Sequence, residues 1–588
     1  MKFVNKLSLA VFGLLAASSL AFGQSANSGK AAPLITYDTQ YQPTLAKNGM
    51  VVSQDFYASE AGLEILKAGG NAVDAAVATG FALAVTHPQA GNLGGGGFMM
   101  VYLKDQNKTI AIDYREMAPA AASRDMFIDA DGNVDKRMAF FSYKSSGTPG
   151  TVKGLVEALH EYGTLPLAQV MAPAIKLADE GFLMDWALEA SLSSPRIMQR
   201  LKASEASAGY YYKADGTPYR KGDLFRQPDL AKTLKAIAEG GIAGFYEGWV
   251  ADKIVATMEA GGGLVTHEDL KAYTVKYREP IEGSYRDVKI VTMPPPSSGG
   301  IHIVQMLNVL EGWDLKGLGH NSADYIHRMA MTMKYAYADR SKYLGDPDYF
   351  DVPVGPLTSK GYGASIRKKI DLTKATPSTE ISPAAKLPEE SNDTTHFSVI
   401  DQYGNMVANT YTLNFSYGSG LAVAGAGFLL NNEMDDFSAK PGSANAFGLL
   451  GGEANAIEPG KRPLSSMTPT FVFKDGKPVL ATGSPGGSVI ITTVLHMVLN
   501  VAEFNMNVQE ATSVPRFHHQ WFPDQIYTEP GISVDTRRML AGMGHKVNTQ
   551  TMGGNRIVGA AQSIVLTPNG MIHGAADPRR PGSHAAGY

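Results

Sequence analysis

An abrupt change of character at Thr394 divides this chain into two parts. Residues 371–393 are mostly Thr, Ser, Pro, Ala, Lys and Glu without apolar periodicity, so we expect a flexible surface linker there. The following residues, Thr394–Ile400, alternate in a β-rich pattern, Asp401–Asn405 are typical turn residues, and Met406–Leu413 form a second β-rich run. This order predicts a β-hairpin that begins directly after the linker.

The geometry of a hairpin makes a specific prediction about Thr394. If the turn centres on Tyr403, Thr394 lies directly opposite Thr412, and the Cβ atoms of directly opposed residues are about 5 Å apart. A bulge at Gly404 would shift this register by one residue.

The second strand of the hairpin carries polar side chains on one face. Because side chains alternate along a strand, Thr410, Thr412 and Asn414 share a face, and two hydroxyls and an amide converge on Thr394. Taken alone, this pattern favours an ordinary explanation, a polar strand face turned to solvent.

The N-terminus has the features of a secretory signal peptide. Lys2 and Lys6 precede an apolar run at Leu7–Leu20, and Ala21–Gly23 supplies small residues at the cleavage-site spacing. The alternative, an uncleaved membrane helix, fits poorly because the run is short. The absence of cysteine suits an oxidising compartment. We therefore expect residues 1–23 to be removed and the soluble product to be periplasmic or secreted, without a membrane anchor.

Composition excludes several classes of protein. The chain has 588 residues, 44% of them hydrophobic, and a net charge of -4. The sequence contains no extended run of basic residues of the kind that nucleic-acid binding needs. Its 13 histidines are scattered and HExxH is absent, and the pair His518-His519 alone is a poor metal site. We therefore expect no nucleic-acid partner, no metal and no cofactor.

The flanking sequence predicts several elements. Helical patterns at Ala58–Ala68 and Ala72–Ala84 precede a glycine-rich loop at Gly91–Gly97 and a strand at Phe98–Leu103. The four consecutive glycines could suggest a phosphate-binding loop, but a strand follows them rather than a helix N-terminus, so we expect close backbone packing. The apolar run Val489–Val501 contains polar residues and predicts a buried helix.

Several long motifs of this chain resemble those of the γ-glutamyltranspeptidase (γ-glutamyltransferase) family, in its bacterial exported form. The resemblance covers nearly all of the chain after the predicted signal peptide, and the motifs occur in the family's order. They are Gly69–Ala76, Asp113–Pro119, Thr394-Thr395-His396, Thr410–Asn414, Leu430–Phe437, Pro463–Met467 and Gly483–Ser488.

The resemblance implies an α+β fold of the N-terminal-nucleophile hydrolase type, an αββα sandwich with two stacked β-sheets between helical layers. It also implies that the precursor cuts itself at the Asp393–Thr394 bond. The products would be a large subunit, residues 24–393, and a small catalytic subunit, residues 394–588, which remain one intertwined heterodimer.

The implied chemistry centres on Thr394. Its hydroxyl would first attack the preceding carbonyl and later, in the mature enzyme, a γ-glutamyl carbonyl. The new α-amine of Thr394 would act as the base, since a Thr hydroxyl is a weak nucleophile without one. By resemblance, Thr412 orients the nucleophile, while the backbone N–H groups of Gly486 and Gly487 form an oxyanion hole. Without the family motifs, these two glycines would be an ordinary helix-entry turn.

The resemblance also assigns residues to the two charges of a γ-glutamyl group. Arg115 offers a planar fork suited to the α-carboxylate. The full set assigned by resemblance is Arg115, Ser465 and Ser466 for the carboxylate, and Asn414, Glu433 and Asp436 for the ammonium. The donor expected from the family is glutathione or another γ-glutamyl compound, and the acceptor is water, an amino acid or a peptide.

One stretch departs from the family pattern. Residues Pro441–Gly448 resemble the lid loop that covers the pocket in bacterial members, but Phe447 stands where typical members carry Tyr. The aromatic cover is expected to persist, whereas a hydrogen bond from the missing hydroxyl is not.

Two alternatives remain from the sequence. A glutaryl-type (cephalosporin) acylase of the same fold would act on substrates without an α-ammonium, so the presence of Glu433 and Asp436 favours γ-glutamyl compounds. A non-catalytic secreted binding protein would not need Thr394, Thr412 or the glycine pair.

Overall fold

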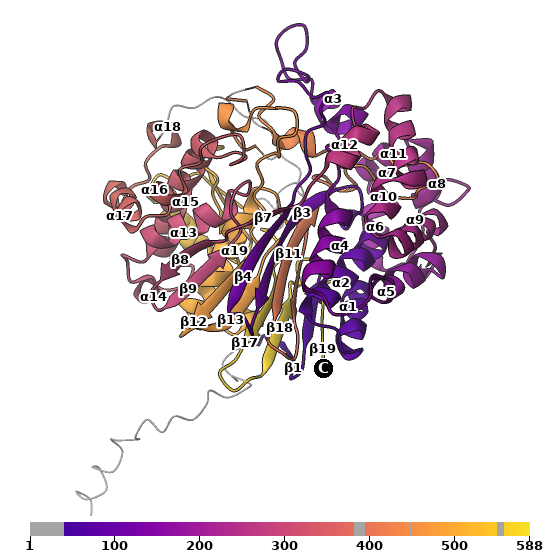
Figure 1. Cartoon of the computed structure of the whole chain (residues 1–588). Coiled ribbons are helices and arrows are strands. Elements are labelled where there is room, and N and C mark those ends of the chain that lie inside the picture. The colour runs from indigo at the N-terminus through magenta and orange to yellow at the C-terminus, as the bar shows by residue number, and fades with distance from the viewer. Residues whose placement is uncertain (1–39, 382–393, 441, 444, 447, 550–557) are drawn as a thin grey trace, which may run out of the picture. The chain divides into compact units, whose positions relative to one another are not determined.

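The predicted hairpin lies at the centre of a β-sheet in the computed structural model (Figure 1). Its two strands, β10 (Thr395–Ile400) and β11 (Met406–Thr412), pair from Thr395–Tyr411 to Ile400–Met406 without a shift of register. The predicted register is confirmed, and no bulge interrupts it. Extended by one pair, the same register sets Thr394 opposite Thr412.

The structure describes residues 40–381, 394–440, 442–443, 445–446, 448–549 and 558–588, and its compact unit is Tyr41–Tyr588. Three predictions fall outside the described residues: the signal peptide at 1–23, Asp393 at the cleavage site, and Phe447 in the lid.

The hairpin belongs to an antiparallel sheet of seven described strands, which we name the hairpin sheet. Strands from before and after Thr394 alternate in it, so neither part of the chain could complete the sheet alone. In spatial order the strands are β19 (His584–Gly587), β2 (Met50–Ser53), β10, β11, β3 (Gly96–Leu103), β4 (Lys108–Tyr114) and β7 (Lys276–Arg278).

A second antiparallel sheet, again of seven described strands, stacks on the first (Figure 1). We name it the second sheet. Its strands, in spatial order, are β1 (Thr44–Ala46), β18 (Ile572–Ala576), β17 (Gln562–Leu566), β13 (Lys477–Thr482), β12 (Thr470–Lys474), β9 (Val288–Thr292) and β8 (Ile281–Tyr285). Two small sheets are formed by β14 (Phe517–His518), β15 (Ile526–Thr528) and β16 (Val547–Asn548), and by β5 (Phe182–Leu183) and β6 (Leu224–Phe225).

Three apolar clusters hold the layers together. The middle cluster lies between the sheets and joins Phe98 and Met100 of the hairpin sheet to Phe471 and Ala481 of the second sheet. The other two clusters cover the outer sheet faces with helices. Because side chains alternate across each strand, the central strands, such as β10 and β11, are buried on both faces. The predicted αββα sandwich is confirmed.

Different helices cover the two outer faces (Figure 1). Those on the hairpin sheet are α1 (Phe56–Lys67), α2 (Ala72–Thr86), α4 (Thr151–Tyr162), α5 (Leu167–Asp179), α6 (Trp186–Leu192), α7 (Pro195–Leu201), α8 (Glu205–Tyr211), α9 (Pro228–Gly240), α10 (Ala243–Tyr246), α11 (Gly248–Gly261) and α12 (His267–Ala272). Those on the second sheet include α13 (Gly299–Leu310), α14 (Leu315–Leu318), α15 (Ala323–Tyr343), α19 (Val489–Ala502) and α21 (Val534–Gly542). The other described helices are α3 (Lys136–Phe141), α16 (Val354–Leu357), α17 (Lys360–Lys369), α18 (Ser378–Ile381) and α20 (Val508–Ser513).

The four-glycine run packs against the strand that carries Thr412. A Cβ atom on Gly95 would lie 2.0 Å from the carbonyl oxygen of Thr412, and one on Gly97 would lie 2.5 Å from that of Thr410. Only a residue without a side chain permits this approach. The expected close backbone packing is confirmed.

The hairpin turn is tied to the start of α2. Asn71 and Asp74 form a capping box there, in which each side chain accepts a backbone N–H of the other residue. The Asp401 carboxylate of the turn accepts the N–H of Ala72 at 2.9 Å and two N–H groups of its own turn. This link fixes the hairpin, and with it Thr394, against the helical layer.

The predicted linker is shorter on its N-terminal side than its composition indicates. Ser378 is buried, and its hydroxyl donates to the carbonyl of Trp521 at 2.6 Å while its N–H donates to Asp524 at 2.8 Å. The N–H of Ala375 donates to Met543. These partners are distant in sequence, which explains why residues 371–381 read as a free segment. Residues 382–393 lie outside the described part of the chain.

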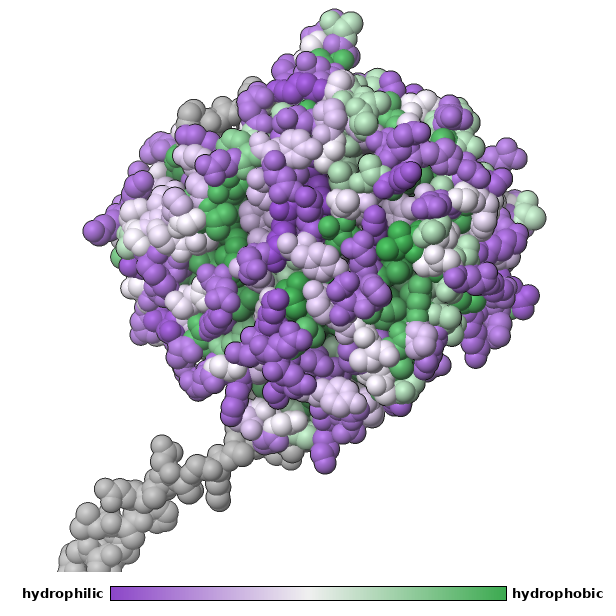
Figure 2. Space-filling model, viewed as in Figure 1, coloured by the Kyte–Doolittle hydropathy of each residue, from purple (hydrophilic) through white to green (hydrophobic). Residues whose placement is uncertain are grey.

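Among the described helices, none combines the length and apolar character needed to cross a membrane. On the face of the protein shown in Figure 2, hydrophobic residues occur in small groups between hydrophilic ones.

Candidate active site

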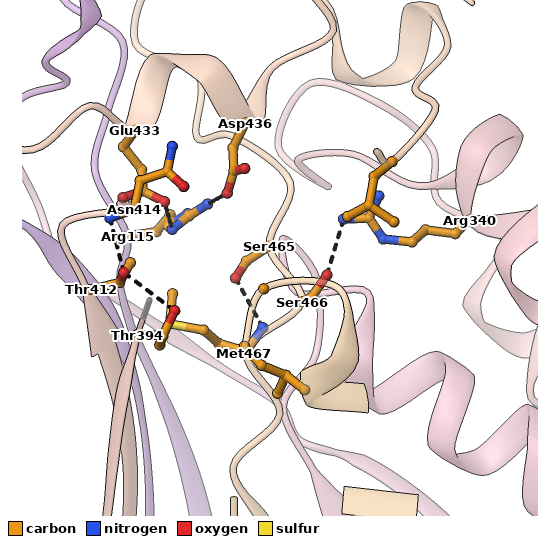
Figure 3. A pocket seen from close by; sticks show the side chains of 13 residues that line it. Arg115, Arg340, Thr394, Thr412, Asn414, Glu433, Asp436, Ser465, Ser466 and Met467 are labelled. Atoms are coloured by element: carbon orange, nitrogen blue, oxygen red, sulfur yellow. Dashed lines mark hydrogen bonds and ion pairs between the residues drawn. The ribbon is translucent and has the colours of Figure 1, made fainter. Parts of the chain in front are cut away.

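The site residues expected from the sequence meet at one end of the stacked sheets (Figure 3). Thr394 directly precedes β10, Thr412 ends β11, and Arg115 directly follows β4. β10 runs antiparallel to β11, and both β11 and β4 run antiparallel to β3. These three positions therefore lie at the same end of the strands of the hairpin sheet. A pocket at this end is lined by Arg115, Arg340, Thr394, Thr412, Asn414, Glu433, Asp436, Leu449, Ser465, Ser466, Met467, Gly487 and Ile490.

Two threonine hydroxyls face each other in this pocket. Thr394 Oγ1 donates to Thr412 Oγ1 at 3.4 Å, and the backbone N–H of Asn414 donates to the same Thr412 oxygen at 2.9 Å. The backbone contact fixes Thr412, and the longer contact leaves the Thr394 hydroxyl close to the limit of a hydrogen bond.

His396 lies two residues from Thr394 but is engaged elsewhere. Its ring nitrogens lie 2.8 Å from the Thr410 hydroxyl and 3.1 Å from the Ser398 hydroxyl. Burial lowers the pKa of His396 to about 3, so the ring is neutral at physiological pH. The histidine is thus part of the packed interior of the hairpin.

A buried ion-pair group forms the opposite wall. Arg115 Nη1 donates to Glu433, and Arg115 Nη2 lies 2.5 Å from an Asp436 carboxylate oxygen. Glu433 and Asp436 come from one 3-10 turn, Glu433–Asp436, so a single turn presents two carboxylates to one guanidinium. Burial alone lowers the pKa of Arg115, but Glu433 and Asp436 more than offset this and hold the pKa above its ordinary value. The pocket therefore contains a buried cation and the two acidic side chains that contact it.

A third carboxylate lies behind this pair. Glu116 is fully buried, lies 3.6 Å from Arg115, and has no hydrogen-bond partner for either carboxylate oxygen among the described residues. Burial raises the pKa of Glu116 to about 7, against the opposing effect of Arg115. Burial likewise raises the pKa of Glu433 well above its ordinary value. Since several carboxylates share one guanidinium, a proton kept on one of them reduces their mutual repulsion.

Asn414 holds a strained position at the end of β11. Its φ of 77° lies in the left-handed region, which Asn tolerates better than most residues. Its side-chain N–H donates to the Asn432 carbonyl at 2.9 Å, while its Oδ1 is buried without a hydrogen-bond partner in the described chain. A buried acceptor of this kind suits an incoming ammonium group.

Ser465 and Ser466 stand in the loop that leads to β12. The N–H of Met467 donates to Ser465 Oγ at 3.1 Å, and Arg340 Nη2 donates to Ser466 Oγ at 3.3 Å. Both hydroxyl oxygens are thus held by donors of the protein, and both side chains line the pocket.

The glycine pair stands at the entrance to α19. Gly486 has φ of 131° and Gly487 has φ of 54°, both in the region that favours glycine. A Cβ atom on Gly486 would lie 2.5 Å from the Val489 side chain. Gly487 lines the pocket, where a helix N-terminus favours negative charge.

The described part of the predicted lid rests on the acidic turn. Asn445 donates to Asp436 at 3.1 Å, and the N–H of Ala446 donates to Asp435 at 3.3 Å. Leu449, which follows the lid stretch, lines the pocket. The lid residues therefore contact the same turn that faces Arg115.

A family model described as Gamma-glutamyltranspeptidase matches residues 58–587. The chain belongs to the γ-glutamyltranspeptidase family. The family predicted from the motifs is thereby confirmed.

Known relatives agree with this membership. The chain is 53% identical to the glutathione hydrolase proenzyme of Escherichia coli (strain K12), with 96% of each chain covered. It is similar to the crystal structure of cephalosporin acylase from Bacillus halodurans, with a TM-score of 0.81 and 29% identity over 95% of this chain and 99% of that chain. Helicobacter pylori γ-glutamyltranspeptidase matches with a TM-score of 0.56 and 45% identity, covering 59% of this chain and 97% of that chain.

The structure brings most of the predicted site residues into one pocket. Gly486 adjoins the pocket without lining it, and Asp393 and Phe447 are outside the described residues. The predicted residues that line the pocket are Arg115, Thr394, Thr412, Asn414, Glu433, Asp436, Ser465, Ser466 and Gly487.

The sequence did not single out Arg340, which also lines the pocket. A signal for it does exist: helical periodicity places Met333, Tyr337 and Arg340 on one face of α15, and the first two are buried. A charged residue on an apolar helix face needs a partner, and this one lies toward the site. Glu116 was likewise read only as part of a motif.

Proposed function

We propose that Thr394 is the catalytic nucleophile of this enzyme. The enzyme cleaves γ-glutamyl amide bonds, including that of glutathione, and passes the γ-glutamyl group to water, amino acids or peptides. The observation that carries the proposal is the Thr394 hydroxyl, 3.4 Å from that of Thr412 and in one pocket with the Arg115 ion pairs. The E. coli relative's name, a glutathione hydrolase proenzyme, supports the same activity.

The first reaction is self-cleavage of the proenzyme. Thr394 Oγ attacks the carbonyl carbon of Asp393, the Asp393–Thr394 C–N bond breaks, and an ester replaces it. The former amide nitrogen takes up a proton and becomes the α-amine of Thr394. Water then hydrolyses the ester and leaves a large subunit, residues 24–393, and a small subunit, residues 394–588.

The second reaction uses the new amine as a base. With a reference pKa of about 7.7–8.0, a part of it is neutral at physiological pH and accepts the hydroxyl proton. Thr394 Oγ attacks the γ-carbonyl carbon, the amide C–N bond breaks, and the leaving amine takes the proton. The resulting γ-glutamyl ester is then opened by water or by an acceptor amine. Thr412 orients the hydroxyl, since its own oxygen is fixed by the N–H of Asn414.

The donor's zwitterionic end matches the two charges of the pocket. Arg115 is paired with Glu433 and Asp436. The donor's α-carboxylate takes the Arg115 side with Ser465 and Ser466, and its ammonium takes the side of the two acids. The Asn414 Oδ1, buried and without a partner among the described residues, accepts from the ammonium.

The glycine pair and the lid complete the proposed site. The N–H groups of Gly486 and Gly487 stabilise the oxyanion of the tetrahedral intermediate, an interaction worth about 3–4 kcal/mol per donor in other enzymes. By resemblance, Phe447, which lies outside the described residues, belongs to the lid, and phenylalanine has no hydroxyl to donate there.

A glutaryl-type acylase is the second candidate, favoured by the similarity to the Bacillus halodurans cephalosporin acylase. Two acids beside Arg115 argue against it, because a glutaryl group has no ammonium to satisfy them. Hydrolysis of γ-glutamyl and glutaryl p-nitroanilides by purified enzyme separates the candidates. We expect the γ-glutamyl compound to be preferred, and a preference for the glutaryl compound would reverse the assignment. Hydrolysis of neither would favour a binding protein.

Export is part of the proposal. The positive n-region, the apolar run and the small residues Ala21 and Gly23 support a signal peptide, and a periplasmic or secreted location follows. N-terminal sequencing of the purified protein tests export and processing together. The large fragment should begin after residue 23 and the small fragment at Thr394. A small fragment that begins elsewhere would refute the mechanism.

A further inference from the structure

Arg340 is a buried cation whose partners are hydroxyl groups. It stands near the end of α15 with 5% of its surface exposed, and its guanidinium points toward Ser466 in the pocket wall (Figure 3). Its Nε donates to Ser298 Oγ at 3.0 Å and its Nη2 to Ser466 Oγ at 3.3 Å. Among the described residues, the structure gives it no ion pair.

Other buried arginines of this chain each have a carboxylate partner. Arg115 pairs with Glu433, Arg462 with Asp113, and Arg516 with Asp577. A buried charge is costly unless an opposite charge compensates it. The contrast indicates that the compensating anion of Arg340 is one that enters the pocket.

Two hydroxyl oxygens of the pocket accept hydrogen bonds from the protein, one of them from Arg340. Ser466 Oγ accepts from Arg340, and Ser465 Oγ accepts from the N–H of Met467. A serine hydroxyl has one hydrogen and two lone pairs, so each oxygen that already accepts from the protein keeps its own hydrogen to donate. Since both side chains line the pocket, those hydrogens are available to an anion in it.

Arg340 fixes the backbone of the same loop through Ser298. The Ser298 hydroxyl accepts from Arg340 Nε and donates to the carbonyl of Ser465 at 2.7 Å, and the Ser298 N–H donates to that carbonyl at 2.8 Å. The Arg340 guanidinium therefore holds the Ser465–Ser466 loop in position through Ser298. It also donates a hydrogen bond to the Ser466 hydroxyl oxygen, which leaves the hydrogen of that hydroxyl to donate.

We propose that Arg340 is a positioning residue that makes the pocket specific for donors with an α-carboxylate. It polarises the Ser466 hydroxyl toward the carboxylate and supplies a positive charge in addition to that of Arg115. This inference rests on the proposed function, in which Ser465 and Ser466 bind the α-carboxylate. Burial lowers the pKa of Arg340 to about 10, against the opposing effect of Asp436, so the side chain remains charged at neutral pH.

The test compares two donors, γ-glutamyl p-nitroanilide and 4-aminobutyryl p-nitroanilide, which lacks the α-carboxylate. A charge-assisted hydrogen bond is worth about 1.5–3 kcal/mol, so Arg340→Gln should raise KM for the γ-glutamyl donor about 10- to 100-fold with a much smaller change in kcat. For the donor without the carboxylate, kcat/KM should be unchanged. Equal losses with both donors would mean a merely structural role and would overturn the proposal.

Two further comparisons sharpen the result. If Arg340 acts through Ser466, the loss in Arg340→Gln/Ser466→Ala should be smaller than the product of the single losses. The matched control is Arg328→Gln on the same helix, whose side chain pairs with Asp324 and does not line the pocket. It should behave as wild type.

Maturation is followed separately by N-terminal sequencing of the small fragment. If the wild type is not cut at Thr394, the proposed function fails, whereas a cut, active enzyme with no donor-specific change in Arg340→Gln refutes only the present inference. If Arg340→Gln does not mature, Arg340→Lys replaces it, because Lys keeps the charge and loses the planar fork. It should raise KM for the carboxylate donor alone, and a loss on both donors or on neither contradicts the proposal.

Discussion

The Thr394 hydroxyl lies 3.4 Å from the Thr412 hydroxyl across the open end of the β10–β11 hairpin. This relationship follows from strand register, because every pair of the hairpin from Ile400–Met406 outward keeps the same alignment. The backbone N–H of Asn414 holds the Thr412 oxygen from the other side. The hairpin thus sets the distance between the proposed nucleophile and the residue that orients it.

Replacing Thr394 with alanine should abolish self-cleavage. Without the hydroxyl no ester can form, so we expect a single polypeptide on a denaturing gel. We also expect no release of p-nitroaniline from γ-glutamyl p-nitroanilide. Thr395→Val is the matched control, since the Thr395 hydroxyl is buried without a hydrogen-bond partner among the described residues. That variant should still be cut. Two fragments from Thr394→Ala would show that another group cleaves the chain.

Thr412 should matter through its oxygen rather than its shape. Thr412→Val keeps the volume but removes the acceptor for Thr394 and for the N–H of Asn414. We expect slower maturation and a kcat about 10- to 100-fold lower, since an acceptor loss of this kind costs about 1–3 kcal/mol. Thr412→Ser should retain most activity. The rate at which the fragments appear measures maturation, and kcat of the mature enzyme measures catalysis. Equal rates and equal kcat for Thr412→Val and Thr412→Ser would contradict this role of the oxygen.

Much of the fold could be predicted because its signals are local. The hairpin register follows from the alternation and turn residues around Asp401–Asn405, and the buried helix α19 follows from one apolar run. The glycine run was correctly assigned to close packing from the strand that follows it. The family motifs indicated the residues that meet in the pocket, which no local pattern could do.

The features that were missed depend on contacts between distant segments. The anchoring of Ser378 requires Asp524 and Trp521, which local composition cannot reveal. Arg340 reaches the pocket only because α15 packs against the Ser465–Ser466 loop, which is distant in sequence. A sequence pattern can place a charge on a buried helix face, but it cannot identify what that charge will face.

Arg115 should contribute to binding rather than to the chemical step. Arg115→Ala leaves Glu433 and Asp436 without their shared cation, and truncating one partner of a buried charged pair often costs about 2–5 kcal/mol. We expect KM for γ-glutamyl p-nitroanilide to rise at least about 30-fold. Arg124→Ala removes a more exposed arginine that pairs with Glu453 and should leave KM unchanged. An unaltered KM for Arg115→Ala would remove this residue from the donor site.

Glu116 should make the stability of the protein fall as pH rises toward neutrality. Burial raises the pKa of Glu116 from 4.5 to about 7, so the folded state holds a proton that the unfolded chain has already released. The stabilising effect of this proton is complete below about pH 4.5 and is lost as pH rises through about 7. The loss is on the order of 3 kcal/mol in total.

Substituting Glu116 with glutamine removes this titration and tests it directly. Thermal unfolding of wild type and Glu116→Gln between pH 4.5 and 8 should show curves that separate as pH rises, with the variant gaining relative stability. The test is how the difference in stability between the two proteins changes with pH. A difference that stays constant with pH would report only the loss of the Arg115 contact. Glu64→Gln, at an exposed position within α1, should follow the wild type. If the wild-type and Glu116→Gln curves stay parallel, the buried carboxylate does not hold the proton assigned to it.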